Sequence, residues 1–153
     1  LPRLFIIGRR GWENHQVFAR LDALPPDGAV REFSGLDDGA VAYLMERSHG
    51  LLMPSRAEGF GLPLTEAAAR GIPVLSAPLP AAREVLGDYA RWLSPDDARA
   101  GAGAVALLAA AAPLRLHPPP LRNWSVYFTQ ADALLRERLQ PASAPAMSGE
   151  RPR

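Results

Sequence analysis

Short apolar runs alternate along the chain with longer segments in which apolar residues recur at helical spacing. The apolar runs predict strands at residues 3–8, 29–35, 50–55, 72–77 and 90–94. The remaining segments predict helices at residues 12–23, 37–48, 62–70, 80–86, 96–111 and 124–139. Strands that are apolar at nearly every position and alternate with helices indicate a parallel sheet covered on both faces. We therefore expect an α/β fold with a doubly wound parallel sheet, whose ligands bind at the carboxyl ends of the strands.

Length and the composition of the tail define the expected domain. A chain of 153 residues with 48% hydrophobic residues is sufficient for one compact domain with a core of ordinary size. From residue 141 onward, the sequence PASAPAMSGERPR is rich in Pro, Ala and Ser and offers almost nothing to bury. We therefore assign residues 1–140 to one domain and residues 141–153 to a disordered tail.

Charge and composition argue against several classes of function. The chain has 17 basic and 16 acidic residues, so its net charge of +1 gives no electrostatic reason to bind nucleic acid or an acidic membrane surface. The absence of cysteine excludes disulfides and thiolate metal sites, which fits a cytoplasmic protein. The 3 histidines are scattered, and we expect no metal. No apolar run approaches the ~20 residues that a membrane-spanning helix requires.

The stretch RAEGFGLPLTEAAARG, residues 56–71, carries the most distinctive chemistry. It follows a predicted buried strand and leads into a helix with Pro63 in the first turn, where proline is tolerated. Gly59 and Gly61 permit close approach of a ligand to the backbone. The helix start favours an anion, which the amides of the sequence Phe60-Gly61-Leu62 would bind. This loop therefore predicts a phosphate site at the carboxyl end of a strand.

Two glutamates in the same stretch narrow the ligand. A carboxylate repels phosphate but accepts hydrogen bonds from two neighbouring hydroxyls. Glu66, one turn inside the helix, suits a ribose diol, and Glu58 on the loop lies nearer to a group beyond the diphosphate. A nucleotide sugar has these parts in that order. The spacing lacks the third glycine of a dinucleotide site, and the chain has no lysine for a P-loop. An acid-base pair of glutamates, as in glycosidases, remains possible in principle.

The same residues resemble a known family. MPSRAEGFGLPLTEAAARGIPVLSA at residues 53–77 contains two glutamates separated by seven residues, with Gly-Phe-Gly-Leu-Pro between them and a Gly-x-Pro-Val strand after them. Arg-Glu-Val and Gly-Asp follow within residues 83–88. The segments FIIGRRGW and VREFSGLDDGAVAYL resemble the two preceding strand-loop units. Over about residues 3–140 the chain is similar to the C-terminal, donor-binding half of retaining glycosyltransferases of the GT-B fold, family 4.

This resemblance implies a role for each matching residue. Glu66 would hold the ribose, and Glu58 would be the catalytic residue beside the transferred sugar. Gly59 and the backbone of Phe60, Gly61 and Leu62 would bind sugar hydroxyls and the diphosphate. The loop that flanks the base would contain Ser34, Gly35 and Leu36. Arg9, together with its neighbours Arg10, Gly11 and Trp12, would end a strand near the same cleft, although Trp12 suits the core equally well.

The implied reaction needs no cofactor and no metal. A sugar would pass from a GDP- or UDP-linked donor to a hydroxyl of a glycan or lipid-linked acceptor, with retention at the anomeric carbon. The sequence GRRGW at residues 8–12 favours the mannosyltransferase-like branch of the family, which builds surface polysaccharides. In the intact enzyme we expect a cytoplasmic location without a transmembrane segment, with peripheral association with the membrane as an option.

One departure from the family pattern concerns the start of the domain. Family members carry an Arg and a Lys on a first strand-loop unit that grips the donor phosphates, and this chain lacks that unit and all lysine. The acceptor-binding N-terminal half is also absent from the sequence. We therefore expect the chain alone to bind donor weakly and to be inactive. The sequence leaves three alternative interpretations. The chain is a noncatalytic nucleotide-sugar-binding module or partner subunit, a nucleotide-sugar epimerase, or a purely structural remnant.

Overall fold

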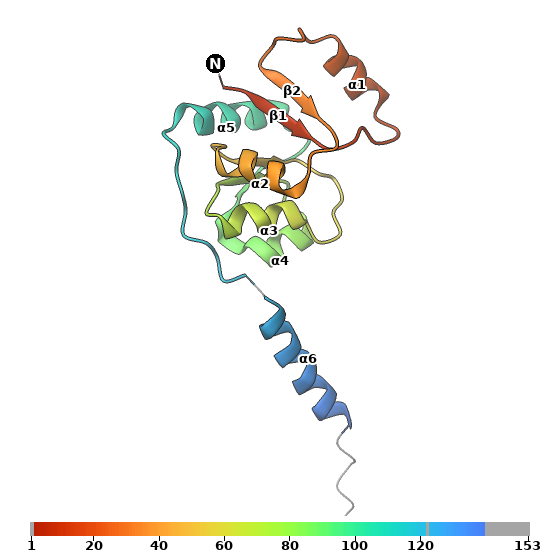
Figure 1. Ribbon diagram of the computed structural model, residues 1–153, viewed down its shortest axis with the longest axis vertical. Coiled ribbons are helices and arrows are strands. Elements are labelled where there is room, and N and C mark those ends of the chain that lie inside the picture. Colours follow the sequence, from red (N-terminus) through yellow and green to blue (C-terminus); the bar gives the residue numbers. More distant parts are fainter. Residues whose placement is uncertain (1, 122, 140–153) are drawn as a thin grey trace, which may run out of the picture. The chain divides into compact units, whose positions relative to one another are not determined.

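Helices and strands alternate along the chain in the order that the hydrophobic pattern predicts. The computed structural model describes residues 2–121 and 123–139. The elements in chain order are β1 (Leu4–Ile7), α1 (His15–Asp22), β2 (Val30–Phe33), α2 (Asp38–Glu46), β3 (Leu51–Met53), α3 (Leu62–Ala69), β4 (Val74–Ser76), α4 (Pro80–Leu86), the 3-10 helix η1 (Gly87–Tyr89), β5 (Arg91–Trp92), α5 (Ala98–Ala110) and α6 (Trp124–Leu139). Each of these strands lies inside a predicted strand segment and is shorter than that segment. Figure 1 labels the α-helices and the first two strands.

The strands form two hydrogen-bonded sheets. β1 pairs with β2, and β3, β4 and β5 pair in that order. Every pairing is parallel, with Leu4 opposite Val30 and Leu51 opposite Val74. The α/β fold class with parallel strands is therefore confirmed. The hydrophobic pattern does not reveal that β1 and β3 belong to separate sheets.

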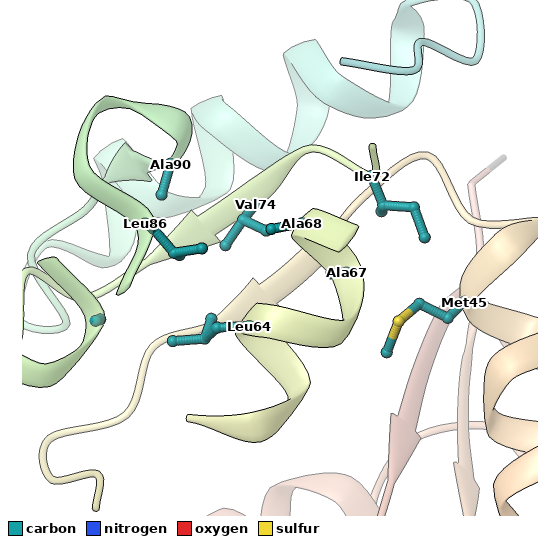
Figure 2. Close-up of a cluster of buried hydrophobic side chains, with 9 residues drawn as sticks. Met45, Leu64, Ala67, Ala68, Ile72, Val74, Leu86 and Ala90 are labelled. Atoms are coloured by element: carbon teal, nitrogen blue, oxygen red, sulfur yellow. The ribbon is translucent and has the colours of Figure 1, made fainter. Parts of the chain in front are cut away.

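The core lies where α3 and α4 pack against β4. Figure 2 shows α3 lying across β4, with Ala68 beside Val74. All residues of β4 are buried, and Leu64, Ala67 and Ala68 form the buried face of α3. The small alanine side chains let the helix approach the sheet closely, while Leu64 fills the space nearest the start of the helix. This packing fixes both the carboxyl end of the sheet and the first turn of α3.

β1 is unusually exposed for a parallel strand. Leu4, Phe5 and Ile7 are 40%, 39% and 41% exposed, whereas strands of parallel sheets are normally buried on both faces. One contact that does cover this strand is the edge-to-face pair of Phe5 with Phe33 on β2, whose ring centroids lie 5.4 Å apart. The amides of Leu4 and Gly8 donate to carbonyl oxygens of Ala29 and Phe33. Because successive amides of a strand alternate in direction, those of Phe5 and Ile7 point away from β2.

The chain divides into two units, Leu1–Pro119 and Pro120–Arg153. This division falls inside the segment that the sequence suggests as one domain. Within the second unit, α6 carries no buried residue. The Trp124 and Phe128 rings stack along this helix, and Tyr127 contacts both of them edge to face. The predicted tail of residues 141–153 lies outside the described residues. No helix in the described part of the chain is long and apolar enough to cross a membrane.

We predict that Leu64→Ala lowers the free energy of unfolding by about 3 kcal/mol, because it leaves a cavity under α3 that the backbone cannot close. Urea denaturation of the chain measures the change. Leu62→Ala on the same helix is the matched control, since Leu62 is 62% exposed, and should cost less than about 0.5 kcal/mol. Equal losses for the two variants would contradict the assigned packing.

Candidate donor-binding site

The stretch with two glutamates forms the loop between β3 and α3. β3 ends at Met53 and α3 begins at Leu62, so residues 54–61 leave the sheet at its carboxyl edge. At the end of β4, the Ser76 hydroxyl and the amide of the following Ala77 donate to the Met53 carbonyl oxygen at 3.2 and 3.1 Å. The base of the loop is thereby attached to the neighbouring strand. The structure thus places the loop where ligands of parallel sheets bind.

The start of α3 leaves backbone amides available to a ligand. Gly61 is the N-cap and Pro63, which has no amide hydrogen, stands in the first turn. The Gly61 carbonyl accepts hydrogen bonds from the amides of Leu64 and Thr65 at 2.9 and 3.3 Å. The amides of Phe60, Gly61 and Leu62 donate to no acceptor within the described residues. Together with the positive end of the helix dipole, they can bind an anion.

Gly61 has a conformation that other residues adopt only with strain. Its φ of 79° lies in the left-handed region, and a Cβ atom there would come within 2.9 Å of Leu64 Cδ1. Gly59, two residues earlier, has no such restriction, since nothing lies within 4 Å of its Cβ position. Gly61 therefore turns the chain into α3 directly above the buried Leu64. Gly59 leaves open space beside the loop.

The two glutamates differ in how the structure holds them. Glu58 is half-buried, and its Oε1 accepts a hydrogen bond of 3.0 Å from the Ser55 hydroxyl. Glu66 lies one turn into α3 on its exposed face, and its carboxylate has no partner within the described residues. Glu58 is thus oriented by its own loop. Glu66 presents both carboxylate oxygens to solvent or to a ligand.

The Ser34-Gly35-Leu36 segment follows β2, at the carboxyl end of the other sheet. Gly35 has a φ of 73°, and nothing lies within 4 Å of its Cβ position. The next residue, Asp37, caps α2 by accepting a hydrogen bond of 2.7 Å from the Ala40 amide. No described hydrogen bond or ion pair joins this segment to the β3–α3 loop. Both segments therefore lie at the carboxyl ends of strands, but no described hydrogen bond or ion pair connects them.

The arginines after β1 have different surroundings. Arg10 donates to both Glu32 carboxylate oxygens at 3.1 and 2.5 Å and to Asp22 at 2.6 Å, and it lies over the Phe18 ring. Its guanidinium lowers the pKa of the Asp22 carboxyl below the ordinary range through that hydrogen bond. Arg9 is exposed and forms no described ion pair. Trp12 is 86% exposed, so it does not belong to the core.

Two contacts at the β3–α3 loop were not anticipated from the sequence. The first is the hydrogen bond from Ser55 to Glu58 described above. The second is an ion pair of 2.5 Å between Arg56 and Asp96, which follows β5. The one sequence signal that could have drawn attention to Ser55 and Arg56 is that both stand just before the Glu58–Glu66 motif. Asp96 lies 40 residues further along the chain, so only the fold brings it to Arg56.

Comparison with known proteins identifies the class. The family model described as glycosyl transferases group 1 matches residues 2–117. The chain therefore belongs to this glycosyltransferase family, as the residues around Glu58 and Glu66 indicate. The Ser34–Leu36 segment and the β3–α3 loop both lie within the matched range.

Several curated mannosyltransferases are similar in sequence to this chain. The serotype-specific mannosyltransferase WbdA of Escherichia coli is 32% identical over 145 residues, which are 94% of this chain and 18% of that protein. The O-antigen chain mannosyltransferase B of Escherichia coli is 32% identical over 94 residues, or 61% of this chain and 25% of that protein. The O-antigen chain mannosyltransferase RfbU of Salmonella typhimurium is 37% identical over 65 residues, or 42% and 18%. The chain thus spans a quarter or less of the length of these relatives.

We predict that Gly61→Ala lowers the free energy of unfolding by about 1 to 3 kcal/mol, because a Cβ atom at positive φ meets Leu64. Thermal or urea denaturation measures the loss. Gly59→Ala serves as control and should leave stability unchanged or raise it by up to about 1 kcal/mol. A Gly61→Ala variant as stable as Gly59→Ala would show that the left-handed turn is not needed.

Proposed function

We propose that this chain is the donor-binding part of an enzyme that transfers a sugar from a nucleotide donor to an acceptor hydroxyl with retention and without a metal. The observation that carries the proposal is the β3–α3 loop, where available amides at the start of α3 adjoin the uncommitted carboxylate of Glu66. Such a loop can hold a diphosphate and a ribose together. Membership of the glycosyltransferase family supplies the reaction class.

Each candidate residue has a role in this proposal. The backbone amides of Phe60, Gly61 and Leu62 bind the diphosphate, and Glu66 accepts hydrogen bonds from the ribose hydroxyls. Gly59 admits the ligand to the backbone. Ser34, Gly35 and Leu36 flank the base, and Arg9 adds positive charge at the carboxyl end of β1. Within the described residues no group of three His, Cys, Asp or Glu side chains could hold a metal ion.

Glu58 acts at the reacting carbon. The bond between the anomeric carbon and the diphosphate oxygen breaks, and the acceptor oxygen forms the new bond to that carbon. Positive charge develops at the sugar and negative charge on the leaving diphosphate, which takes up the acceptor proton. The carboxylate of Glu58, oriented by Ser55, stabilises the positive charge, and the start of α3 stabilises the leaving group.

The relatives support a proposal for the sugar and the acceptor. Their names describe mannosyltransferases, two of them acting on O-antigen chains. We propose mannose as the sugar, a GDP- or UDP-linked donor, and a glycan or lipid-linked acceptor held by an N-terminal half outside this chain. A cytoplasmic site of action, with or without peripheral membrane association, and the absence of nucleic acid partners stay predictions from the sequence.

Another part of the proposal concerns the division between the sheets. In the usual doubly wound order 3-2-1-4-5-6, the first strand lies at the centre of the sheet. The pairs β2-β1 and β3-β4-β5 reproduce the two sides of that order and leave its central position without a strand in the described part of the chain. We propose that a strand outside residues 1–153 lies between β1 and β3. Its loop would carry the phosphate-gripping Arg and Lys of the family, so residues 1–153 alone should not catalyse transfer.

We predict that Glu66→Ala in the complete enzyme weakens donor affinity by about 1.5 to 3 kcal/mol, the scale for a lost hydrogen bond to a charged group. Titration calorimetry with the donor or its nucleoside diphosphate measures the change. Glu137→Ala, at an exposed position of α6, removes the same charge elsewhere and should leave affinity unchanged. Unchanged affinity in Glu66→Ala would refute the assigned role. Donor binding without any transfer in the complete enzyme would favour a noncatalytic module.

Amide exchange tests the proposed central strand. In residues 1–153, the amides of Phe5 and Ile7 should exchange with solvent much faster than those of Leu4 and Gly8, which donate to β2. In a longer natural polypeptide that supplies the strand, Phe5 and Ile7 should become protected. Hydrogen exchange followed by NMR measures both states. If Phe5 and Ile7 remain unprotected in the longer polypeptide, no strand pairs with β1.

A further inference from the structure

Arg56 occupies a place in the site that the proposed reaction has not yet used. It stands two residues before Glu58 on the β3–α3 loop. Its guanidinium donates to one Asp96 carboxylate oxygen at 2.5 Å, and no second partner lies within the described residues. A guanidinium has five N–H groups, so Arg56 retains most of its donors. Arg56 is thus a cation on the loop that leads into α3, with spare hydrogen-bonding capacity.

The Arg56–Asp96 pair is weakly held. The two side chains are 71% and 69% exposed, and ion pairs with that exposure contribute little to stability. The contact is monodentate, unlike the two-oxygen contact that Arg10 makes with Glu32. Arg10 has three carboxylate contacts and an aromatic ring around it, so it is not available to a ligand. Arg56 can therefore exchange its partner at small cost, whereas Arg10 cannot.

A diphosphate bound by the β3–α3 loop would compete with Asp96 for the Arg56 guanidinium. A terminal phosphate offers more negative charge and more acceptor oxygens than one carboxylate, and guanidinium groups bind phosphate in a two-point geometry. The chain has no lysine, so every cation that could neutralise the leaving group from within it is an arginine or a histidine. Loss of Asp96 as a partner would also release the β3–α3 loop from the loop after β5.

We infer that Arg56 binds phosphate in the donor site. While the site is empty, Asp96 holds the Arg56 guanidinium by an ion pair. The inference rests on the proposed function and adds to it a cationic contact with the diphosphate. When donor binds, Arg56 leaves Asp96 and donates to diphosphate oxygens. When the nucleoside diphosphate dissociates, Asp96 takes Arg56 back. Asp96 therefore weakens phosphate binding to a small extent, because it competes for the same guanidinium.

The test is an NMR titration of residues 1–153, which detects binding even in the millimolar range. GDP and guanosine are the probes, with UDP and uridine as the second pair. The Arg56 Nε–H signal, identified by its loss in Arg56→Lys, should shift with the nucleoside diphosphate and not with the nucleoside. Arg56→Ala should weaken nucleoside diphosphate binding about tenfold and leave nucleoside binding unchanged. Asp96→Asn should leave diphosphate binding unchanged or tighten it severalfold.

Controls separate this inference from the proposed function. Arg20→Ala, at an exposed position near the end of α1, removes the same charge and should not change binding. Equal weakening by Arg56→Ala and Asp96→Asn would mean that the pair only holds the loop, and no effect of Arg56→Ala would mean that Arg56 does not touch phosphate. Either result overturns the inference if Glu66→Ala still weakens binding. If Glu66→Ala has no effect on binding, the proposed function itself fails and the inference fails with it. If neither nucleotide binds to the unmodified chain, the inference alone is overturned, because the proposed function allows a strand outside residues 1–153 to supply the phosphate contacts.

Discussion

The packing of α3 against β4 is the constraint on which the candidate site depends. Leu64 is almost fully buried, and the left-handed Gly61 lies directly above it, so the first turn of the helix cannot shift without opening the core. Ala67 and Ala68 continue the buried face, while Glu66 projects from the opposite side. A well-packed helix therefore carries the amides and the carboxylate that the proposed donor would contact. Preorganisation of this kind reduces the ordering that a ligand must impose.

Charge in the site is distributed between committed and available groups. Arg10 is fixed by Glu32, Asp22 and Phe18, and its role is to join α1 to β2. Glu58 is oriented by Ser55, whereas Glu66 has no described partner. This difference fits the two proposed tasks, because a residue at a reacting carbon benefits from a fixed position. A residue that accepts hydrogen bonds from both hydroxyls of a diol needs both carboxylate oxygens available.

The division of the strands into two sheets leaves one edge of β1 without a partner strand in the described part of the chain. β4 is fully buried, but β1 exposes Leu4, Phe5 and Ile7 and directs two amides away from its partner strand. Exposed apolar strands with unpaired edges tend to pair with further strands. The same position is the centre of a doubly wound sheet, beside which ligands of this fold class bind. In the proposed function, the strand that would pair with this edge of β1 would therefore also contribute to the donor site.

The sequence by itself determined the order of the elements, the α/β class and the family, because strand and helix periodicity and the Glu58–Glu66 motif are local patterns. It named Gly59 and Gly61 alike, and only the structure shows that Gly61 is the one in the left-handed conformation. Only the tertiary structure decided the division between β1 and β3, the exposure of Trp12, and the separate grouping of α6. It alone brought Asp96 to Arg56. These features depend on which surfaces find partners across long stretches of chain, and local periodicity carries no information about distant partners.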